Sequence, residues 1–106
     1  MKVNMKALHI IANVGYTDQI MDILRTAGAT GSTIVHARGE GSHHHSFLGI
    51  TLDFEREIII SVVNEETAER ILADVAEKLG CNTEVHGICY MMPVEKAVGI
   101  NLSTLR

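Results

Sequence analysis

Two groups of residues with chemical potential lie next to each other near the middle of the chain. Gly39 and Gly41 form a Gly-x-Gly within Arg38-Gly39-Glu40-Gly41. Glycine allows tight turns and close approach of the backbone to a ligand, but a lone Gly-x-Gly is most simply explained as a turn. Three histidines follow it directly, His43, His44 and His45. Neutral imidazole is the commonest metal ligand in proteins, so a metal site is the second chemistry to consider.

The histidine triplet has two interpretations. Consecutive residues of an extended loop point in different directions, so one chain would supply one or two ligands and neighbouring chains the rest. No cysteine or carboxylate pair nearby completes a zinc set. We therefore assign no metal ligand and favour a polar loop tip. The alternative is a metal-binding protein that uses His43, His44 and His45. It would resemble the trimeric proteins of the divalent-cation tolerance type.

No catalytic set stands out elsewhere in the sequence. It contains no nucleophile elbow, no P-loop lysine motif and no His-Glu-x-x-His. The acidic residues are not paired in a recognisable way. We therefore expect a protein that is not an enzyme and that holds no catalytic residues.

Composition limits the class of protein further. The chain has 106 residues, 46% of them hydrophobic, which suits one folded domain spanning residues 1–106. The formal net charge of −4 argues against nucleic acid as a partner. Cys81 and Cys89 are too few for a disulfide framework, which favours a cytoplasmic location. No apolar run is long enough for insertion into a membrane.

Hydrophobic periodicity predicts four strands and two helices. The first helix begins with Thr17 or Asp18 as its cap and ends at Gly28, and the second is capped by Asn64 and ends at Gly80. The strands are expected at residues 5–13, 32–38, 57–63 and 85–92, the last of them cut by Pro93. The order β-α-β-β-α-β predicts an α+β, ferredoxin-like sandwich with both helices on one face of an antiparallel sheet. The tail, 94–106, fits either a short helix or an edge strand.

The connection between the second and third strands is far longer than a usual hairpin turn, and such loops are commonly functional. We expect it to be exposed. It contains a short apolar run, Phe47, Leu48, Gly49 and Ile50. This run either packs back on the sheet or forms a surface that binds a partner protein, and the sequence leaves both possibilities open.

The third strand is apolar on both of its faces. Ile58, Ile60 and Val62 alternate with Ile59 and Val63. A sheet that faces water on one side should alternate more cleanly. We therefore expect the face without helices to be buried in a closed homo-oligomer. The alternative is a β-branched strand that is partly solvated.

Four segments, in this order, resemble the PII signal-transduction family (nitrogen regulatory protein P-II). They are 28–33, Arg38-Gly39-Glu40-Gly41, 80–87 and Met92-Pro93-Val94-Glu95-Lys96-Ala97-Val98-Gly99. The resemblance implies a homotrimer of ferredoxin-like subunits, with a long T-loop at about 39–56 and a B-loop at about 80–87. It further implies that a small effector, such as an adenine nucleotide, binds in clefts between subunits. The T-loop would contact a target protein, such as a membrane transporter, through residues such as 47–50.

The resemblance also implies the residues of the effector cleft. One subunit would supply Thr33, Arg38, Gly39, Gly41 and Ser42, and its neighbour His86, Gly87 and Ile88. Gly39 and Gly41 can present backbone N–H groups to a phosphate, and Thr33 can hydrogen-bond a purine edge.

The chain departs from the family at its phosphate-binding cations. Ile88 stands where nucleotide-binding members have a lysine, and Gly99 and Asn101 stand where they have arginines. Burying a triphosphate without cations is expensive, so AMP, another nucleotide or a metabolite is favoured over ATP. Tyr16 and Tyr90 lie on expected scaffold elements, so uridylylation of the loop is not expected.

Overall fold

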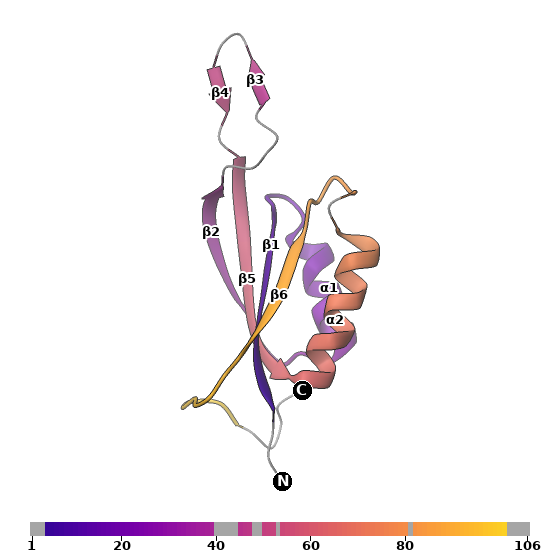
Figure 1. Ribbon diagram of the computed structural model, residues 1–106, viewed down its shortest axis with the longest axis vertical. Coiled ribbons are helices and arrows are strands. Elements are labelled where there is room, and N and C mark those ends of the chain that lie inside the picture. The colour runs from indigo at the N-terminus through magenta and orange to yellow at the C-terminus, as the bar shows by residue number, and fades with distance from the viewer. Residues whose placement is uncertain (1–3, 40–44, 48–49, 53, 81, 102–106) are drawn as a thin grey trace.

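The computed structural model describes residues 4–39, 45–47, 50–52, 54–80 and 82–101. In these ranges the chain forms eight elements: β1 (Met5–Asn13), α1 (Thr17–Ala27), β2 (Thr33–Gly39), β3 (His45–Phe47), β4 (Ile50–Leu52), β5 (Phe54–Asn64), α2 (Glu65–Lys78) and β6 (Ile88–Pro93). The four long strands form one sheet in the order β2-β5-β1-β6, and every neighbouring pair is antiparallel (Figure 1). The expected ferredoxin-like layout is confirmed.

Both helices cover the same face of this sheet (Figure 1). The core between the helices and the sheet is built from aliphatic side chains that are almost fully buried. It comprises Leu8, Ile10, Ala12, Ile20, Ile23, Leu24, Ile59, Val63, Ala68, Ile71, Val75, Leu79 and Val85. These residues recur every second position in the strands and every third or fourth in the helices, which is the pattern that places them on one face.

Local signals fix most helix ends as expected. Gly28 has a left-handed backbone with φ of 97° and ends α1. The side chain of Asn64 accepts a hydrogen bond of 2.9 Å from the N–H of Thr67 and caps α2. The predicted cap of α1 was wrong. The capping position is Tyr16, and no side chain makes a capping hydrogen bond there.

The last strand begins later than predicted. β6 starts at Ile88, and Val85 lies instead in the loop after α2, with its side chain buried in the core. His86 has a positive φ of 48°, which breaks the extended run between Val85 and Ile88. After Pro93, residues 94–101 contain neither helix nor strand, so neither expected form of the tail is found there.

The long loop contains a small hairpin of its own. β3 and β4 pair antiparallel, with Phe47 opposite Ile50. The hairpin extends beyond the ends of β2 and β5, away from the helices (Figure 1). The molecule is therefore elongated, 58 Å by 26 Å by 20 Å.

The face of the sheet opposite the helices, hereafter the open face, is strongly apolar. Strand register and side-chain alternation place the following residues on it: Ala7, His9, Ile11, Thr33, Val35, Ile58, Ile60, Val62, Ile88, Tyr90 and Met92. His9 and Tyr90 stack with ring centroids 5.2 Å apart. Val35, Ile88, Tyr90 and Met92 are each more than 40% exposed in the single chain. Such a patch is unusual for the surface of a monomer.

Among the described residues, no helix is long and apolar enough to cross a membrane.

Candidate functional site

Three connections meet at the end of the sheet from which the hairpin projects. β2 ends here at Gly39, opposite Phe54 of β5. The end of β1 and the turn after it are tied to both neighbours. The N–H of Asn13, the last residue of β1, donates to the Val85 oxygen at 3.1 Å, and that of Val14 donates to the Glu55 oxygen at 3.4 Å. The base of the T-loop, the β1–α1 turn and the B-loop are thus held together by backbone hydrogen bonds.

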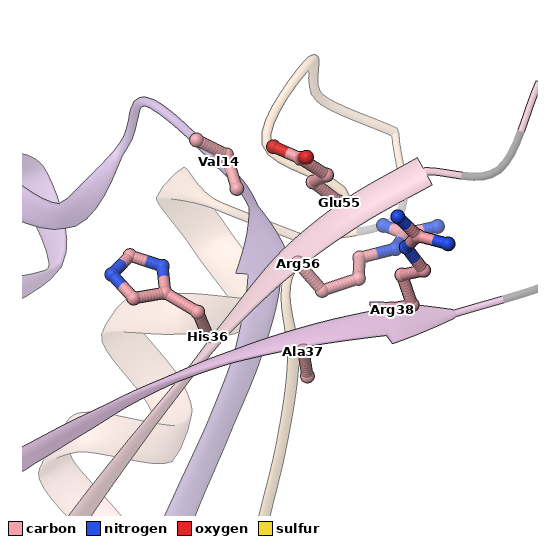
Figure 2. Close-up of a pocket in the computed structure, with 6 residues that line it drawn as sticks. All are labelled: Val14, His36, Ala37, Arg38, Glu55 and Arg56. Atoms are coloured by element: carbon pink, nitrogen blue, oxygen red, sulfur yellow. The ribbon is translucent and has the colours of Figure 1, made fainter.

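A groove of about 410 Å³ lies at this end of the sheet. Its described lining is Val14, His36, Ala37, Arg38, Glu55 and Arg56. Figure 2 shows the Arg38 and Arg56 side chains at the same end of the groove, one from β2 and the other from β5. Two guanidinium groups against one carboxylate make this groove suited to an anion.

Arg38 was among the predicted site residues, but Arg56 was not. The sequence offered only an indirect signal for Arg56, which is its place just after the long loop, as Arg38 stands just before it. The strand register brings Arg56 close to Arg38, because Arg56 on β5 pairs with Ala37, the residue next to Arg38 on β2. The guanidinium of Arg56 donates a hydrogen bond to the side-chain oxygen of Asn13.

A second groove, of about 360 Å³, lies beside the start of β2. It is called the neutral groove below, and the first is called the arginine groove. The described lining of the neutral groove is Thr30, Gly31, Ser32, Thr33, Ile60, Ser61, Val62, Gly99, Ile100 and Asn101. All of these are uncharged. The predicted site residue Thr33 is therefore brought together with Gly99 and Asn101, the two positions where the resemblance leads one to look for arginines.

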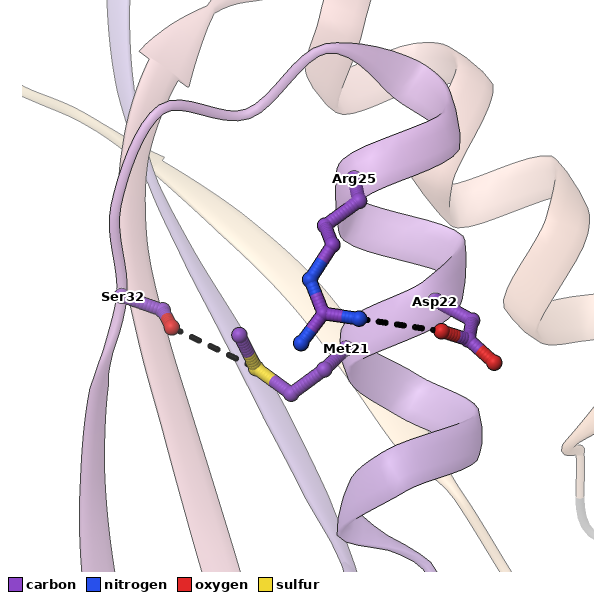
Figure 3. A network of polar contacts seen from close by, with 4 residues as sticks. All are labelled: Met21, Asp22, Arg25 and Ser32. Carbon is purple, nitrogen blue, oxygen red and sulfur yellow. Dashed lines mark hydrogen bonds and ion pairs between the residues drawn. The ribbon is translucent and has the colours of Figure 1, made fainter.

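Hydrogen bonds fix the wall of this second groove. The hydroxyl of Ser61 donates to the Gly31 oxygen at 2.6 Å and joins β5 to the segment before β2. The hydroxyl of Ser32 contacts the sulfur of Met21 at 3.4 Å, which joins the same segment to α1 (Figure 3). On the outer side of α1, Arg25 and Asp22 form an exposed ion pair at 3.1 Å (Figure 3).

The two grooves are separate within one chain. Thr33 and Arg38 are five residues apart on β2, which corresponds to about 17 Å of extended strand. No described residue lines both grooves. The predicted residues of a single effector cleft are therefore divided between two places on the monomer.

The B-loop is held in a defined shape. The side chain of Thr83 donates to the Gly80 oxygen at 2.8 Å, and the N–H of His86 donates to the Thr83 oxygen at 3.2 Å. His86 has the only positive φ among the described residues other than glycine, which is an uncommon conformation. His86 and Ile88 are exposed, and Gly87 packs closely on the end of α2. The structure thus leaves accessible two of the three residues that the neighbouring subunit was predicted to supply.

Several predicted residues fall outside the described ranges. They are Gly41 and Ser42 of the effector cleft and Leu48 and Gly49 of the partner-binding run. Phe47 and Ile50 form the last pair of the β3–β4 hairpin. The backbone of this hairpin lies beyond the four-stranded sheet rather than against it (Figure 1).

The metal alternative stays a prediction. His43 and His44 lie outside the described ranges, and His45 is the first residue of β3. Among the described residues, no three His, Cys, Asp or Glu side chains gather as a metal site would require.

Cys89 does not contribute a nucleophile. It lies on β6 opposite Ile10 and packs against the core. Burial raises the pKa of the Cys89 thiol to about 12. The thiol is therefore protonated at neutral pH and unreactive.

Comparisons with known proteins agree with this architecture. The sequence profile of the family described as "Nitrogen regulatory protein P-II" matches residues 5–103. No curated protein sequence matches the chain. Among solved structures, a PII-like signaling protein from Thermus thermophilus is 28% identical, with a TM-score of 0.68 over 87% of this chain and 88% of that one.

Two further structures share the fold at lower identity. CPII from Thiomonas intermedia, a nitrogen regulatory PII-like protein solved with ADP, AMP and bicarbonate, is 24% identical, with a TM-score of 0.65 over 89% of this chain and 96% of that one. The complex of B. subtilis GlnK with ATP is 18% identical, with a TM-score of 0.70 over 97% of this chain and 93% of that one.

Proposed function

The chain belongs to the nitrogen regulatory protein P-II family of signalling proteins, and we propose that it is a cytoplasmic, homotrimeric sensor that binds an adenine nucleotide of low charge between its subunits. Binding changes the arrangement of the T-loop, and the T-loop then alters the activity of a target protein such as a membrane transporter. Regulation rather than catalysis is the role of this family.

The trimer is supported by the open face. Its central residues Ile58, Ile60 and Val62 are only partly buried in the single chain, although every one of them is aliphatic. Burying apolar surface contributes about 25 cal/mol per Å². A closed ring in which each open face packs on its neighbours removes this surface from water without leaving an edge for further growth.

The division of the predicted cleft supports the same assembly. Thr33 lies in the neutral groove and Arg38 in the arginine groove. Neither groove of a single chain therefore contains the whole predicted cleft. In a ring, the neutral groove and the arginines of one subunit can face the B-loop of the next, whose His86, Gly87 and Ile88 would complete the site. The neutral groove would receive the base and sugar of a nucleotide, and the arginines its phosphate.

The charges favour a nucleotide with few phosphates. Arg38 and Arg56 supply two positive charges, partly offset by Glu55. Ile88, Gly99 and Asn101 add none. CPII was solved with AMP and ADP, and GlnK with ATP. This chain has fewer cationic side chains at the proposed cleft than the family's nucleotide binders. It should therefore bind AMP or ADP more tightly than ATP, because each unpaired phosphate charge that is buried costs free energy.

The T-loop is the part of the molecule best placed to reach a target. Its β3–β4 hairpin projects from the end of the sheet at which the arginine groove lies (Figure 1). A ligand that binds one T-loop arrangement better than another shifts the population towards it. The apolar residues 47–50 would then make contact with the target protein.

One observation carries the proposal: Arg38 and Arg56 line a single groove at the base of the T-loop. The test is calorimetric titration of AMP, ADP and ATP into the purified protein, with the mass of the assembly measured by light scattering. We expect a trimer that binds AMP or ADP. Arg38→Ala should weaken binding at least tenfold, and Gly39→Trp should abolish it, both with the trimer intact.

Arg25→Ala is the matched control. Arg25 is exposed on α1 and pairs only weakly with Asp22, so its removal should leave nucleotide affinity unchanged. Equal affinities for the native protein and Arg38→Ala would reject the site. A monomer in solution would reject the assembly on which the site depends.

A further inference from the structure

Asn13 occupies the junction between the two loops of the proposed site. It is the last residue of β1, the second strand in from one edge of the sheet. Its side-chain oxygen accepts the hydrogen bond from the guanidinium of Arg56. Its side-chain NH₂ donates to the main-chain oxygen of Glu84 at 3.0 Å. One amide group thus joins the strand that leaves the T-loop to the B-loop.

Neighbouring contacts reinforce this junction. The backbone N–H of Asn13 donates to the Val85 oxygen, next to the carbonyl that its side chain contacts. The hydroxyl of Tyr16 donates to the carboxylate of Glu84 at 3.3 Å. The B-loop is therefore held at two successive residues, Glu84 and Val85, by the end of β1 and the turn that follows it.

The chemistry of the junction suits asparagine. The Arg56 bond needs an acceptor and is charge-assisted, whereas the Glu84 carbonyl needs a donor. Aspartate would keep the acceptor but would place an oxygen against the Glu84 carbonyl. Alanine would remove both bonds. An amide carries its acceptor and its donor on two separate atoms, so it can serve both loops at once.

We propose that Asn13 is a positioning residue that couples the B-loop to the base of the T-loop. Displacing Arg56 pulls on the amide and loosens residues 82–87, and ordering the B-loop fixes Arg56 in return, since coupling between two places is reciprocal. Arg56 makes other interactions as well. The proposed coupling is therefore the part of the effect of Arg56 on the B-loop that depends on Asn13. The role of this coupling in signalling rests on the proposed function, but the coupling itself does not.

The test needs no ligand. Hydrogen exchange of the B-loop amides is measured by mass spectrometry in the native protein, Arg56→Gln, Asn13→Ala and the double variant. Arg56→Gln should speed exchange at 82–87 by roughly fivefold, the size expected from one lost hydrogen bond. In the Asn13→Ala background the same change should have no further effect on the B-loop. This non-additivity is the signature of coupling.

Two variants separate positioning from simple destabilisation. Asn13→Asp keeps the acceptor for Arg56 and loses the donor to Glu84, so it should loosen the B-loop while the start of β5, residues 55–58, exchanges as in the native protein. Arg25→Gln, which removes an exposed arginine of α1, should change neither region.

The outcomes are distinct. The coupling is overturned if Arg56→Gln leaves the exchange rate of the B-loop amides unchanged. It is also overturned if Arg56→Gln changes that rate equally in the native and the Asn13→Ala backgrounds. Both results hold whatever the protein binds. Failure to bind any nucleotide would reject the proposed function and leave this measurement as it stands.

Discussion

The backbone N–H of Gly87 donates a hydrogen bond of 2.6 Å to the carbonyl oxygen of Leu79. A Cβ built on Gly87 would lie 2.5 Å from the same oxygen. The end of the B-loop is therefore pressed against the C-terminal end of α2 at a distance that only glycine allows. This contact, together with the positive φ of His86, determines where β6 begins.

Gly87→Ala should destabilise the protein by about 1–3 kcal/mol, because the methyl group must push the Leu79 carbonyl aside. Urea unfolding followed by circular dichroism measures the change. Gly31→Ala is the control, since a Cβ on Gly31 meets no atom within 4 Å. Similar midpoints for the two variants would contradict the close packing at Gly87.

Asn64→Ala should lower the free energy of unfolding by about 1 kcal/mol, because the N–H of Thr67 then loses its capping acceptor. Asn64→Asp retains an acceptor oxygen and should stay close to the native stability. The same urea experiment compares them. A full loss in Asn64→Asp would mean that capping is not the role of the side chain.

Burial of Cys89 predicts a fall in stability at alkaline pH. The pKa of its thiol rises from 9.0 to about 12 on folding, so between these values the unfolded chain releases the proton while the folded one keeps it. The free energy of unfolding should therefore decrease as pH rises from 9 towards 12. Cys89→Ala should show a shallower decrease, and the difference between the two pH profiles isolates this group from the lysines and tyrosines. Parallel profiles would show that the thiol is not desolvated.

A charge on the open face should dissociate the proposed trimer. Val35 is 41% exposed in the single chain, so Val35→Glu should leave the monomer folded and break the contact between subunits. Light scattering should report a monomer with native circular dichroism. Ala73→Glu, on the exposed side of α2, should remain a trimer, and a trimeric Val35→Glu would place the interface elsewhere.

Adding cations to the proposed cleft should change its nucleotide preference. Ile88→Lys combined with Asn101→Arg puts positive charge at two of the positions where the family's nucleotide binders have it. We expect ATP affinity to rise about tenfold or more, or ~1.4 kcal/mol, with a smaller gain for AMP. Calorimetry on the double variant, after its trimer has been verified, gives the ratio. An equal gain for both nucleotides would place the new charges away from the terminal phosphates.

The elements with strong local signals could be predicted from the sequence. β1 has the predicted bounds, and Gly28 and Asn64 act as expected at helix ends. The positions of α1 and α2 follow directly from the spacing of their aliphatic residues. The order of elements then predicts that both helices lie on one face of the sheet, because only one handedness of crossover is common.

Other features depend on contacts that are distant in sequence. Val85 belongs to an apolar run and so resembled the start of a strand, but the contact between Gly87 and Leu79 turns the chain there. β3 and β4 have three residues each, which is too short for a strand pattern to be recognised from the sequence. The place of Arg56 beside Arg38 and Asn13 follows only from the register of β5 with β1 and β2. The predicted effector residues remain a prediction, and the division of Thr33 and Arg38 between two grooves could not be read from their spacing alone.

The position of β1 in the sheet has a consequence for biosynthesis. β1 pairs with β5 and β6, and with neither of the elements that follow it directly. A nascent chain therefore carries its first strand without a partner until residues 56–64 have left the ribosome, and it completes the sheet only after residue 93. Folding must await these distant closures, which are slow compared with local ones. A chaperone that recognises short apolar segments would find its binding site in a strand that later becomes one of the two central strands of the sheet.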